Sequence, residues 1–296
     1  MKKAGKTYDK PILFDYINTI GLSILALVMI FPMYYTLIIS FARPRALLAS
    51  ELYILPTSFT LETYQFIFAG GRQILNSFFV SVFVTVVGVT LSMVLSTILA
   101  YAISKPQVPF TKGINVYIII TLFFNAGLVP YYLTVQAVGL INTIWVMMVP
   151  MAINAFFIVL MRNYFQSLPT SLEESARMDG ANDLAILIRI ILPLSKPILA
   201  TVSLFYAVDR WNEWWHPMLF ISDSNLMPLQ LVLRHMLINV VSTPGLGSAL
   251  RQAHAPIYAR SLQMAVVVVA MVPIMSLYPF LQKYFSKGIM LGAVKG

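Results

Sequence analysis

The polar stretch Leu168-Pro-Thr-Ser-Leu-Glu-Glu-Ser-Ala-Arg-Met-Asp-Gly-Ala-Asn-Asp-Leu184 lies in an otherwise apolar chain and holds four of its eleven acidic residues. Ser171 with Glu174 three residues later fits a capping box, in which hydroxyl and carboxylate each bind a free amide at a helix start. Gly180 stands where a helix would end in a left-handed residue. Asn182 or Asp183 can cap a second helix, which Pro193 stops. The stretch therefore predicts two short helices.

A helix this short gains little from propensity in water, so it needs a surface to pack on. Its apolar face (Leu172, Ala176, Met178) and its acidic edge suggest a segment that another protein receives. The alternative is a solvated helical hairpin, and periodicity alone does not decide between the two.

Composition indicates a membrane protein. Hydrophobic residues make up 59% of the 296 positions, charged residues only 10%, and the mean hydropathy is +0.80. The net charge of +9 comes from basic residues scattered between apolar runs, which fits the positive-inside rule better than binding to nucleic acid. Cysteine is absent, so no disulfide framework exists.

Apolar runs predict six membrane spans, because a spanning helix needs about 20 mostly apolar residues. Residues 113–161 carry no charge over 49 positions, which is too long for one helix, so we expect two helices there. The turn between them belongs near 130–143, where Gly127, Pro130, Gly139 and Asn142 cluster. The expected spans are 16–42, 74–103, 113–130, 143–162, 198–220 and 261–282, within a domain of residues 16–285.

The distribution of basic residues predicts the orientation. The N-terminal tail (1–15), the 105–112 turn, the 162–197 stretch and the C-terminal tail carry thirteen Lys or Arg, against six in the segments expected on the other side. Both termini and the 168–197 loop should therefore be cytoplasmic, and the first apolar run should be a retained first span.

Several kinds of chemistry are missing from the sequence. It has no G-x-x-x-x-G-K-[ST] nucleotide-binding loop, so energy must come from a partner or from an ion gradient. It has no H-E-x-x-H or G-x-S-x-G motif, and its three histidines are too dispersed for a metal site. We therefore expect no catalytic residues, no metal site and no cofactor in this chain.

The fifth expected span carries the group Asp209-Arg210-Trp211-Asn212-Glu213-Trp214-Trp215-His216. A charge at bilayer depth costs at least about 2.5 kcal/mol, so these charges need an interior or aqueous environment. Two interpretations stay open: an internal ion pair, or the polar wall of a substrate path. We expect Asp209 and Arg210 to form a structural ion pair, and Trp211, Asn212, Glu213, Trp214 and His216 to line the path. The tryptophans could instead be interfacial belt residues.

Glu174-Ser-Ala-Arg-Met-Asp-Gly180-Ala181, followed by Ile191-Leu-Pro193 and Pro197, resembles the EAA loop of binding-protein-dependent ABC importers. In that family the loop belongs to the membrane subunit and docks on a cytoplasmic ATPase. Ser175 stands where the family usually has alanine, and it is small enough for docking. The resemblance implies ATPase-coupling roles for Glu173, Glu174, Ser175, Ala176, Met178, Asp179, Gly180 and Ala181.

Two further segments resemble sugar permeases of this family. Trp211-Asn212-Glu213-Trp214 with Pro217 is similar to their W-N-[DE]-[aromatic] signature. The tail from Gln282 to Gly296 is similar to the C-terminus of the maltose-type second permease, where it can reach between ATPase subunits; this implies ATPase contacts for Gly292, Ala293, Val294, Lys295 and Gly296.

Together these observations predict an all-α, six-helix membrane subunit with the type I ABC importer permease fold, in a bacterial cytoplasmic membrane. The resemblance implies a second homologous permease, two ATPase subunits that bind ATP and Mg, and a periplasmic or extracellular solute-binding protein. It also implies an oligosaccharide or polysaccharide substrate, with alginate as one candidate. The competing hypothesis is an ion-coupled secondary transporter that uses Asp209 and Glu213.

Overall fold

The computed structural model describes residues 13–43, 53–55, 58–65, 67–68, 72–242 and 256–288, and this part of the chain contains helices and no strand. The chain divides into two compact units, residues 1–67 with 239–269 and residues 68–238 with 270–296. The helices are, in order, α1 (Leu13–Ser40), α3 (Glu62–Gln65), α4 (Arg72–Ser104), α5 (Thr111–Phe123), α6 (Leu128–Ala137), η2 (Ile144–Met147), α7 (Ala155–Gln166), α8 (Thr170–Met178), α9 (Asp183–Ile186), η3 (Leu187–Ile191), α10 (Leu192–Leu194), α11 (Lys196–Trp211), α12 (Trp215–Phe220), η4 (Ser224–Leu226), α13 (Leu229–Ser242) and α15 (Pro256–Gly288).

The longest apolar helices have the length and composition of membrane spans. Among the described residues, Leu13–Ser40 and Gln73–Ser104 are each long and apolar enough to cross a bilayer. Asp183–Leu194 and Lys196–Trp211 pass the same test together, with an 85° bend between them. Thr111–Phe123 and Arg260–Ser276 are shorter apolar helices. The chain is a multi-helix membrane protein.

In the first unit, the C-terminal end of α1 is the part that packs. Ile38 and Ile39 are buried there with Ala42 and Tyr53, and Met264 of α15 packs against them. The rest of α1 exposes apolar side chains along its length, as expected of a helix that faces lipid.

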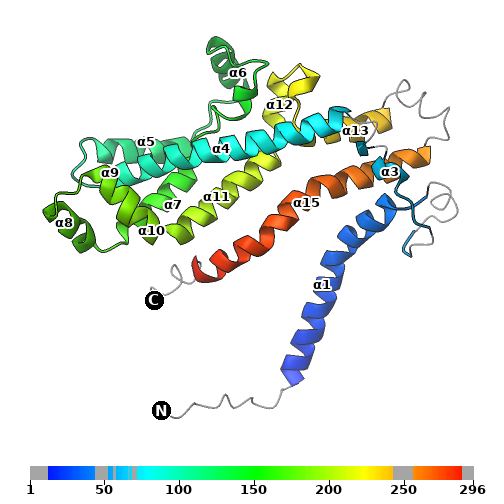
Figure 1. Cartoon of the computed structure of the whole chain (residues 1–296), viewed down its shortest axis with the longest axis horizontal. Helices are drawn as coiled ribbons and strands as arrows, with labels where there is room; N and C mark the ends of the chain where they lie inside the picture. Colours follow the sequence, from blue (N-terminus) through cyan, green and yellow to red (C-terminus); the bar gives the residue numbers. More distant parts are fainter. Residues whose placement is uncertain are drawn as a thin grey trace. The chain divides into compact units, whose positions relative to one another are not determined.

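The second unit is organised around α4. Helices α5, α7 and α11 pack on it, as Figure 1 shows, with α8 at one end of this group. Its core contains Ile103, Ile158, Met161 and Val202, all 1% exposed or less. Small polar side chains of α4 lie inside this packing: Ser96 bonds the Tyr206 hydroxyl at 2.7 Å. Small residues of this kind let helices approach closely in a membrane protein.

The third and fourth spans differ from the sequence prediction. The expected helix 113–130 ends at Phe123, and α6 occupies part of the expected turn. Gly127 (φ 83°), Gly139 (φ 74°) and Asn142 (φ 56°) are all left-handed, which confirms that the chain turns at these residues. The expected helix 143–162 is also wrong, because residues 148–154 are irregular and α7 begins only at Ala155, capped by the side chain of Asn154.

The predicted fifth span, 198–220, is not continuous either. Helix α11 ends at Trp211, and α12 begins at Trp215 after a break at 212–214. Pro217 lies in the first turn of α12, where its missing N–H leaves no helical bond unmade. The break places the polar group Asp209–His216 at a helix end instead of along one helical face.

The 168–197 loop folds as two short helical segments, with two local corrections. Helix α8 begins at Thr170 after Pro169 and has no side-chain cap, so the expected Ser171–Glu174 capping box is wrong. Pro193 does not stop the second helix, because the π-helical turn η3 precedes it and the helix runs on to Leu194. A π-turn of this kind widens the helix where a proline ring would otherwise clash with the preceding turn.

The two turn signals in this loop are confirmed. Gly180 has φ +82°, Ala181 N donates to Ala176 O at 2.9 Å, and Gly180 N donates to Arg177 O at 3.0 Å. These two bonds form a Schellman motif that ends α8. Asn182 caps the next helix, because its Oδ1 accepts the Ala185 N–H at 2.8 Å.

Candidate functional site

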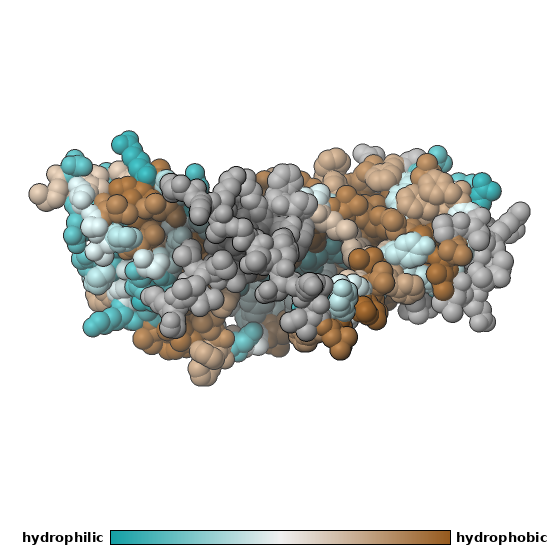
Figure 2. All heavy atoms as spheres, turned by 90° about the horizontal axis from the view of Figure 1, so that it is seen from below, coloured by the Kyte–Doolittle hydropathy of each residue, from teal (hydrophilic) through white to brown (hydrophobic). Residues whose placement is uncertain are grey.

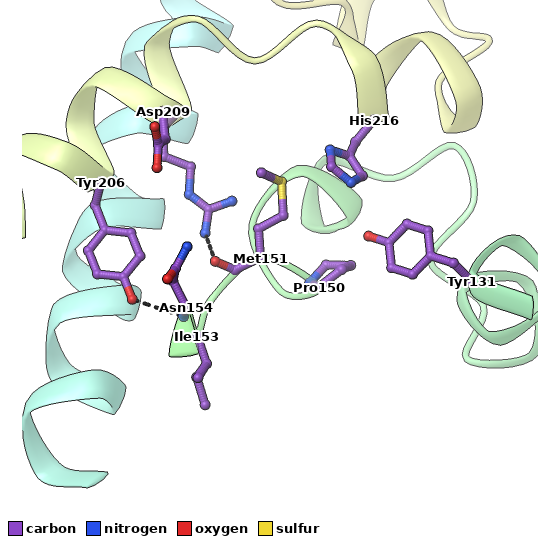
Figure 3. Close-up of a pocket in the computed structure, with 9 residues that line it drawn as sticks. Tyr131, Pro150, Met151, Ile153, Asn154, Tyr206, Asp209 and His216 are labelled. Atoms are coloured by element: carbon purple, nitrogen blue, oxygen red, sulfur yellow. Dashed lines mark hydrogen bonds between the residues drawn. The ribbon is translucent and has the colours of Figure 1, made fainter. Parts of the chain in front are cut away.

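Two neighbouring cavities lie beside the break between α11 and α12. The first, about 280 Å³, is lined by Tyr131, Pro150, Met151, Ile153, Asn154, Tyr206, Asp209, Arg210 and His216. The second, about 350 Å³, is lined by Met151, Val208, Asp209, Asn212, Glu213, Trp214 and Trp215. Met151 and Asp209 line both. Figure 3 shows the side chains of the first cavity arranged around Met151, with Tyr131 and His216 on one side and Tyr206 and Asn154 on the other.

Arg210 holds the irregular wall of the first cavity in place. Its guanidinium is buried, with 3% of the residue exposed, and it donates to Met147 O (2.7 Å), Ser92 Oγ (3.1 Å), Met148 O (3.3 Å) and Met151 O. Backbone carbonyls outside a helix must find donors when they are buried in a membrane protein. One side chain therefore satisfies three carbonyls of the 147–151 segment.

Arg210 has no ion pair with Asp209 among the described residues, so the predicted structural ion pair is wrong. The two residues are adjacent on α11, and neighbours at i and i+1 point to different faces of a helix. Arg210 turns into the protein, whereas Asp209 is exposed and lines both cavities. Among the described residues Arg210 forms no ion pair with Glu213 either.

Glu213 shapes the break itself. Its Oε1 accepts the backbone N–H groups of Trp215 (2.8 Å) and His216 (3.0 Å) at the start of α12, and it lies 3.1 Å from His216 Nδ1. A carboxylate at a helix N-terminus satisfies free amides there and is favoured by the helix dipole. Glu213 thus fixes the entry of α12 while its side chain lines the second cavity.

Tyr206 joins three elements on the other side of the first cavity. Its hydroxyl bonds Ser96 of α4 and accepts the backbone N–H of Asn154 at 3.1 Å. Asn154 in turn caps α7 by accepting from Phe156 N at 2.9 Å. These bonds position the polar end of α7 at the cavity.

The structure separates the predicted path residues. Asn212, Glu213 and Trp214 line the second cavity, and His216 lines the first. Trp211 does not: it is 6% exposed, donates its Nε1 to Ala270 O at 3.0 Å and packs edge-on against Phe78. Its assignment to the path is wrong, because the last turn of α11 directs the indole into helix packing.

The cavities combine aromatic rings with hydrogen-bonding groups. Tyr131 and His216 meet edge to face at 5.6 Å between ring centroids, as do Trp214 and Trp215 at 5.6 Å. Arg234 of α13 stacks over the Trp214 ring at 3.7 Å. Aromatic faces with a few fixed polar groups suit a hydroxylated ring. In the described part of the chain, no cluster of three or more His, Cys, Asp or Glu side chains could hold a metal ion.

Helix α8 presents the residues expected to couple to an ATPase. Glu174, Ser175, Asp179 and Gly180 are exposed, and Met178 is 89% exposed. Ala176 and Ala181 pack against the core, and Glu173 is buried, so these three are not part of an exposed docking face. Figure 2 shows hydrophilic atoms gathered next to apolar ones at the α8 end. The tail residues 292–296 lie outside the described residues.

Several residues that line the cavities or pack beside them carry little signal in the sequence. Tyr206 and Tyr131 gave no local signal, since a tyrosine within an apolar helix is common. Asn154 carried a usable one, because an asparagine before an apolar run is typical of a helix N-cap. Arg234 is a lone cation in a polar segment, and only the tertiary fold brings it over Trp214.

Comparison with known proteins identifies the family. Residues 75–291 match the family described as binding-protein-dependent transport system inner membrane component. The polygalacturonan/rhamnogalacturonan transport system permease protein YtcP of Bacillus subtilis is 39% identical, over 96% of this chain and 99% of YtcP. Protein LplC of the same organism is 40% identical, over 99% of this chain and 97% of LplC.

One solved structure has the same fold. A chain from the crystal structure of a bacterial ABC transporter involved in the import of the acidic polysaccharide alginate matches with a TM-score of 0.86 and 32% identity, covering 93% of this chain and 100% of that one. The ABC importer permease fold is thereby confirmed, and the comparisons give no support to an ion-coupled transporter. The chain belongs to the family of binding-protein-dependent transport system inner membrane components, the non-catalytic membrane subunits of ABC importers.

Proposed function

We propose that this chain is one of two different membrane subunits of an ATP-driven importer of oligosaccharides or polysaccharide fragments. Its partners would be a second homologous permease, two ATPase subunits that bind ATP and Mg, and an external solute-binding protein. The observation that carries this proposal is α8, a short helix with an exposed Glu174 and Met178 on a family-matched permease. A short helix that exposes apolar side chains beside charged ones suits the groove of a partner protein.

The two cavities support a saccharide substrate. Trp214, Trp215 and Tyr131 offer ring faces and edges, and Asn212, Asp209 and His216 offer hydrogen-bonding groups within the same small volume. A sugar ring presents apolar C–H faces and a rim of hydroxyls, which such a wall can bind. The names of the relatives favour the same substrate class: YtcP is named as a permease protein of a polygalacturonan/rhamnogalacturonan transport system, and the solved transporter is described as involved in the import of alginate.

The proposed mechanism is alternating access. When ATP closes the ATPase dimer, α8 is carried with its partner, and the helices behind it move relative to the second permease. The 85° bend between Leu194 and Lys196 separates the α8 side of the loop from α11, which carries Asp209 to both cavities. Motion at one end of this unit can thereby open or close the wall at the other.

The proposed orientation places both termini and α8 in the cytoplasm of a bacterial cell with this chain in its inner membrane. Thirteen Lys or Arg residues on the α8 side, against six on the other, favour this arrangement. It puts the docking helix on the side where ATP is available.

The proposal is tested by purifying the chain with its partner subunits in lipid nanodiscs and measuring ATP hydrolysis. Addition of the binding protein loaded with oligogalacturonate or oligoalginate should stimulate hydrolysis, whereas the empty binding protein should stimulate it less. A neutral oligosaccharide panel serves as the comparison for substrate class. Absence of a co-purifying ATPase, or hydrolysis that no loaded binding protein stimulates, would contradict the proposal.

A further inference from the structure

Glu173 and Glu174 are neighbours on α8, but the structure sends them in opposite directions. Glu174 is exposed, whereas Glu173 forms an ion pair with Lys105 in which the side chains of Lys105 and Glu173 are only 14% and 11% exposed. Glu173 is therefore directed into the protein, and its partner lies just after the end of a different helix. An ion pair with so little solvent contact is sensitive to the loss of either partner, because the remaining charge is left buried and unpaired.

This ion pair joins two helix ends. Lys105 directly follows the last residue of α4, and Glu173 lies in the first turn of α8. A cation at a helix C-terminus and an anion at an N-terminus are each favoured by the helix dipole. Lys105 also lies 4.7 Å over the ring of Tyr101. The end of α4 and the start of α8 thus both favour this ion pair.

Helix α7 completes the junction. Arg162 Nε donates to Ile103 O at 3.4 Å, and Gln166 Nε2 donates to Ser104 O at 3.3 Å, so the last carbonyls of α4 are held by side chains of the helix that leads into α8. The end of α4 is thus tied to α8 by a charge pair and to α7 by hydrogen bonds.

The same helix α4 reaches the first cavity. Ser96 bonds the Tyr206 hydroxyl at 2.7 Å, and Ser92 accepts from Arg210 at 3.1 Å; both partners line that cavity. At about 1.5 Å per residue, Ser92 lies about 20 Å along the helix from Lys105. A continuous helix between the two points can transmit a displacement of its end to the cavity wall.

A second ion pair of the loop is exposed to solvent and joins two residues of the loop itself. Arg177 and Asp183 are 2.9 Å apart, with side chains 42% and 74% exposed, and both belong to the loop itself. Exposed pairs of this kind contribute little to stability. This pair is a matched control for a charge interaction that links the loop to nothing beyond it.

We propose that Glu173 and Lys105 are positioning residues that link α8 to α4, so that movement of α8 reaches the cavity wall through α4. This inference rests on the proposed docking of an ATPase on α8. Glu174 would contact the ATPase, and Glu173 would transmit the movement of α8 to α4 through Lys105. Neither residue of the pair touches the substrate.

The test uses the full importer, with Glu173→Gln, Lys105→Met and the double variant in this chain. The measured quantity is substrate taken up per ATP hydrolysed, together with the ratio of stimulated to basal hydrolysis. We expect each single variant to assemble and to lose at least about fivefold in uptake per ATP, the low end of measured coupling energies. The double variant should be better than either single one, because it leaves no unpaired charge. Asp183→Asn, which removes the exposed pair, should stay within about twofold of wild type.

The outcomes separate this inference from the proposed function. Glu174→Lys should prevent ATPase assembly; if it assembles and transports normally, the docking proposal fails. If Glu174→Lys behaves as expected but the single variants at Glu173 and Lys105 keep wild-type uptake per ATP, the link fails and the docking proposal stands. If the single variants do not assemble, assembly of the double variant would support the pair. Failure of the double variant as well would show a folding role alone and overturn the inference.

Discussion

Gly180 is the residue at which the sequence prediction and the structure agree most closely. Its φ of +82° ends α8, and no atom beyond the two adjacent residues lies within 4 Å of the position where a Cβ would stand. Any penalty for a substitution there therefore comes from backbone strain and not from a clash. Strain in the left-handed region is about 1–2 kcal/mol for an ordinary L-residue and smaller for asparagine.

We predict that Gly180→Val weakens ATPase association while Gly180→Asn largely preserves it. A strain of about 1–2 kcal/mol lowers the equilibrium constant for the native turn by a factor of about 5–30, which sets the upper limit of the loss of affinity. Binding of the purified ATPase to nanodiscs that contain each variant measures the effect. Equal affinity of the valine variant and the wild type would show that the shape of this turn does not matter for docking.

Arg210 is the residue at which the structure departs most from the sequence prediction. A sequence can show that a charge lies in an apolar helix, and it correctly indicates that the charge needs partners. It cannot show that the partners are three carbonyls of a segment about 60 positions earlier. An acid and a base close in sequence suggest an ion pair, so the sequence predicts Asp209 as the partner, but adjacency on a helix prevents that contact.

We expect substitutions at Ser92 and at Arg210 to lower the stability of the fold by different amounts. Ser92→Ala removes one hydrogen bond and should lower the free energy of unfolding by about 0.5–1.5 kcal/mol. Arg210→Met leaves buried carbonyls without donors, and each carbonyl that finds no water should lower it by about 1–3 kcal/mol. Thermal unfolding of the two variants in detergent measures the difference. If the Arg210→Met variant were as stable as the Ser92→Ala variant, the carbonyls would have other donors.

At the scale of elements, α8 follows from local signals and the broken helices do not. The left-handed glycine and the Asn182 cap are properties of a few neighbouring residues, so the sequence contains them. The start of α8 was misplaced because Pro169 and Thr170 can begin a helix without the serine cap. The irregular segment before α7 is apolar and uncharged, like a span, but in the fold its carbonyls at Met147 and Met151 bond to Arg210 instead of closing helical turns.

The exposed face of α8 yields a prediction for the element as a whole. Met178→Asp places a charge on a side chain that is 89% exposed, so it should leave folding intact but disfavour an apolar contact with the ATPase. Ser224→Asp, on the exposed η4 segment, is the matched control. Co-purification of the ATPase should fall for the first variant only. Normal recovery of the ATPase with Met178→Asp would exclude this residue from the docking face.

At the scale of the whole molecule, the charge distribution predicts the side of the membrane for each loop. The natural chain has no cysteine, so single substitutions report without background. Ser171→Cys on α8 should react with a membrane-impermeant maleimide only after the cells are opened, and Ser224→Cys should react in intact cells; both positions are exposed. Labelling of Ser171→Cys in intact, sealed cells would reverse the proposed orientation.

The membrane character and the family resemblance could be taken from the sequence because composition and a thirty-residue motif are properties of the chain alone. The cavities could not, since they are formed by α6, α11 and α12 together with the irregular segment before α7 and the break at 212–214. Asn212, Glu213, Trp214 and His216 line the cavities, and their place in a substrate path stays a prediction. Trp211, the last residue of α11, is buried and lines neither cavity.

ATP-driven uptake in proteoliposomes decides whether this chain works as the membrane subunit of an importer. The importer, with this chain, its partner permease and the ATPase subunits, is reconstituted with ATP on the α8 side and the loaded binding protein on the other. Accumulation of labelled oligosaccharide is then measured with ATP, with a non-hydrolysable analogue, and with ionophores that collapse ion gradients. We predict uptake that requires hydrolysable ATP and the binding protein, and that persists with ionophores. Uptake without ATP that ionophores abolish would contradict the account.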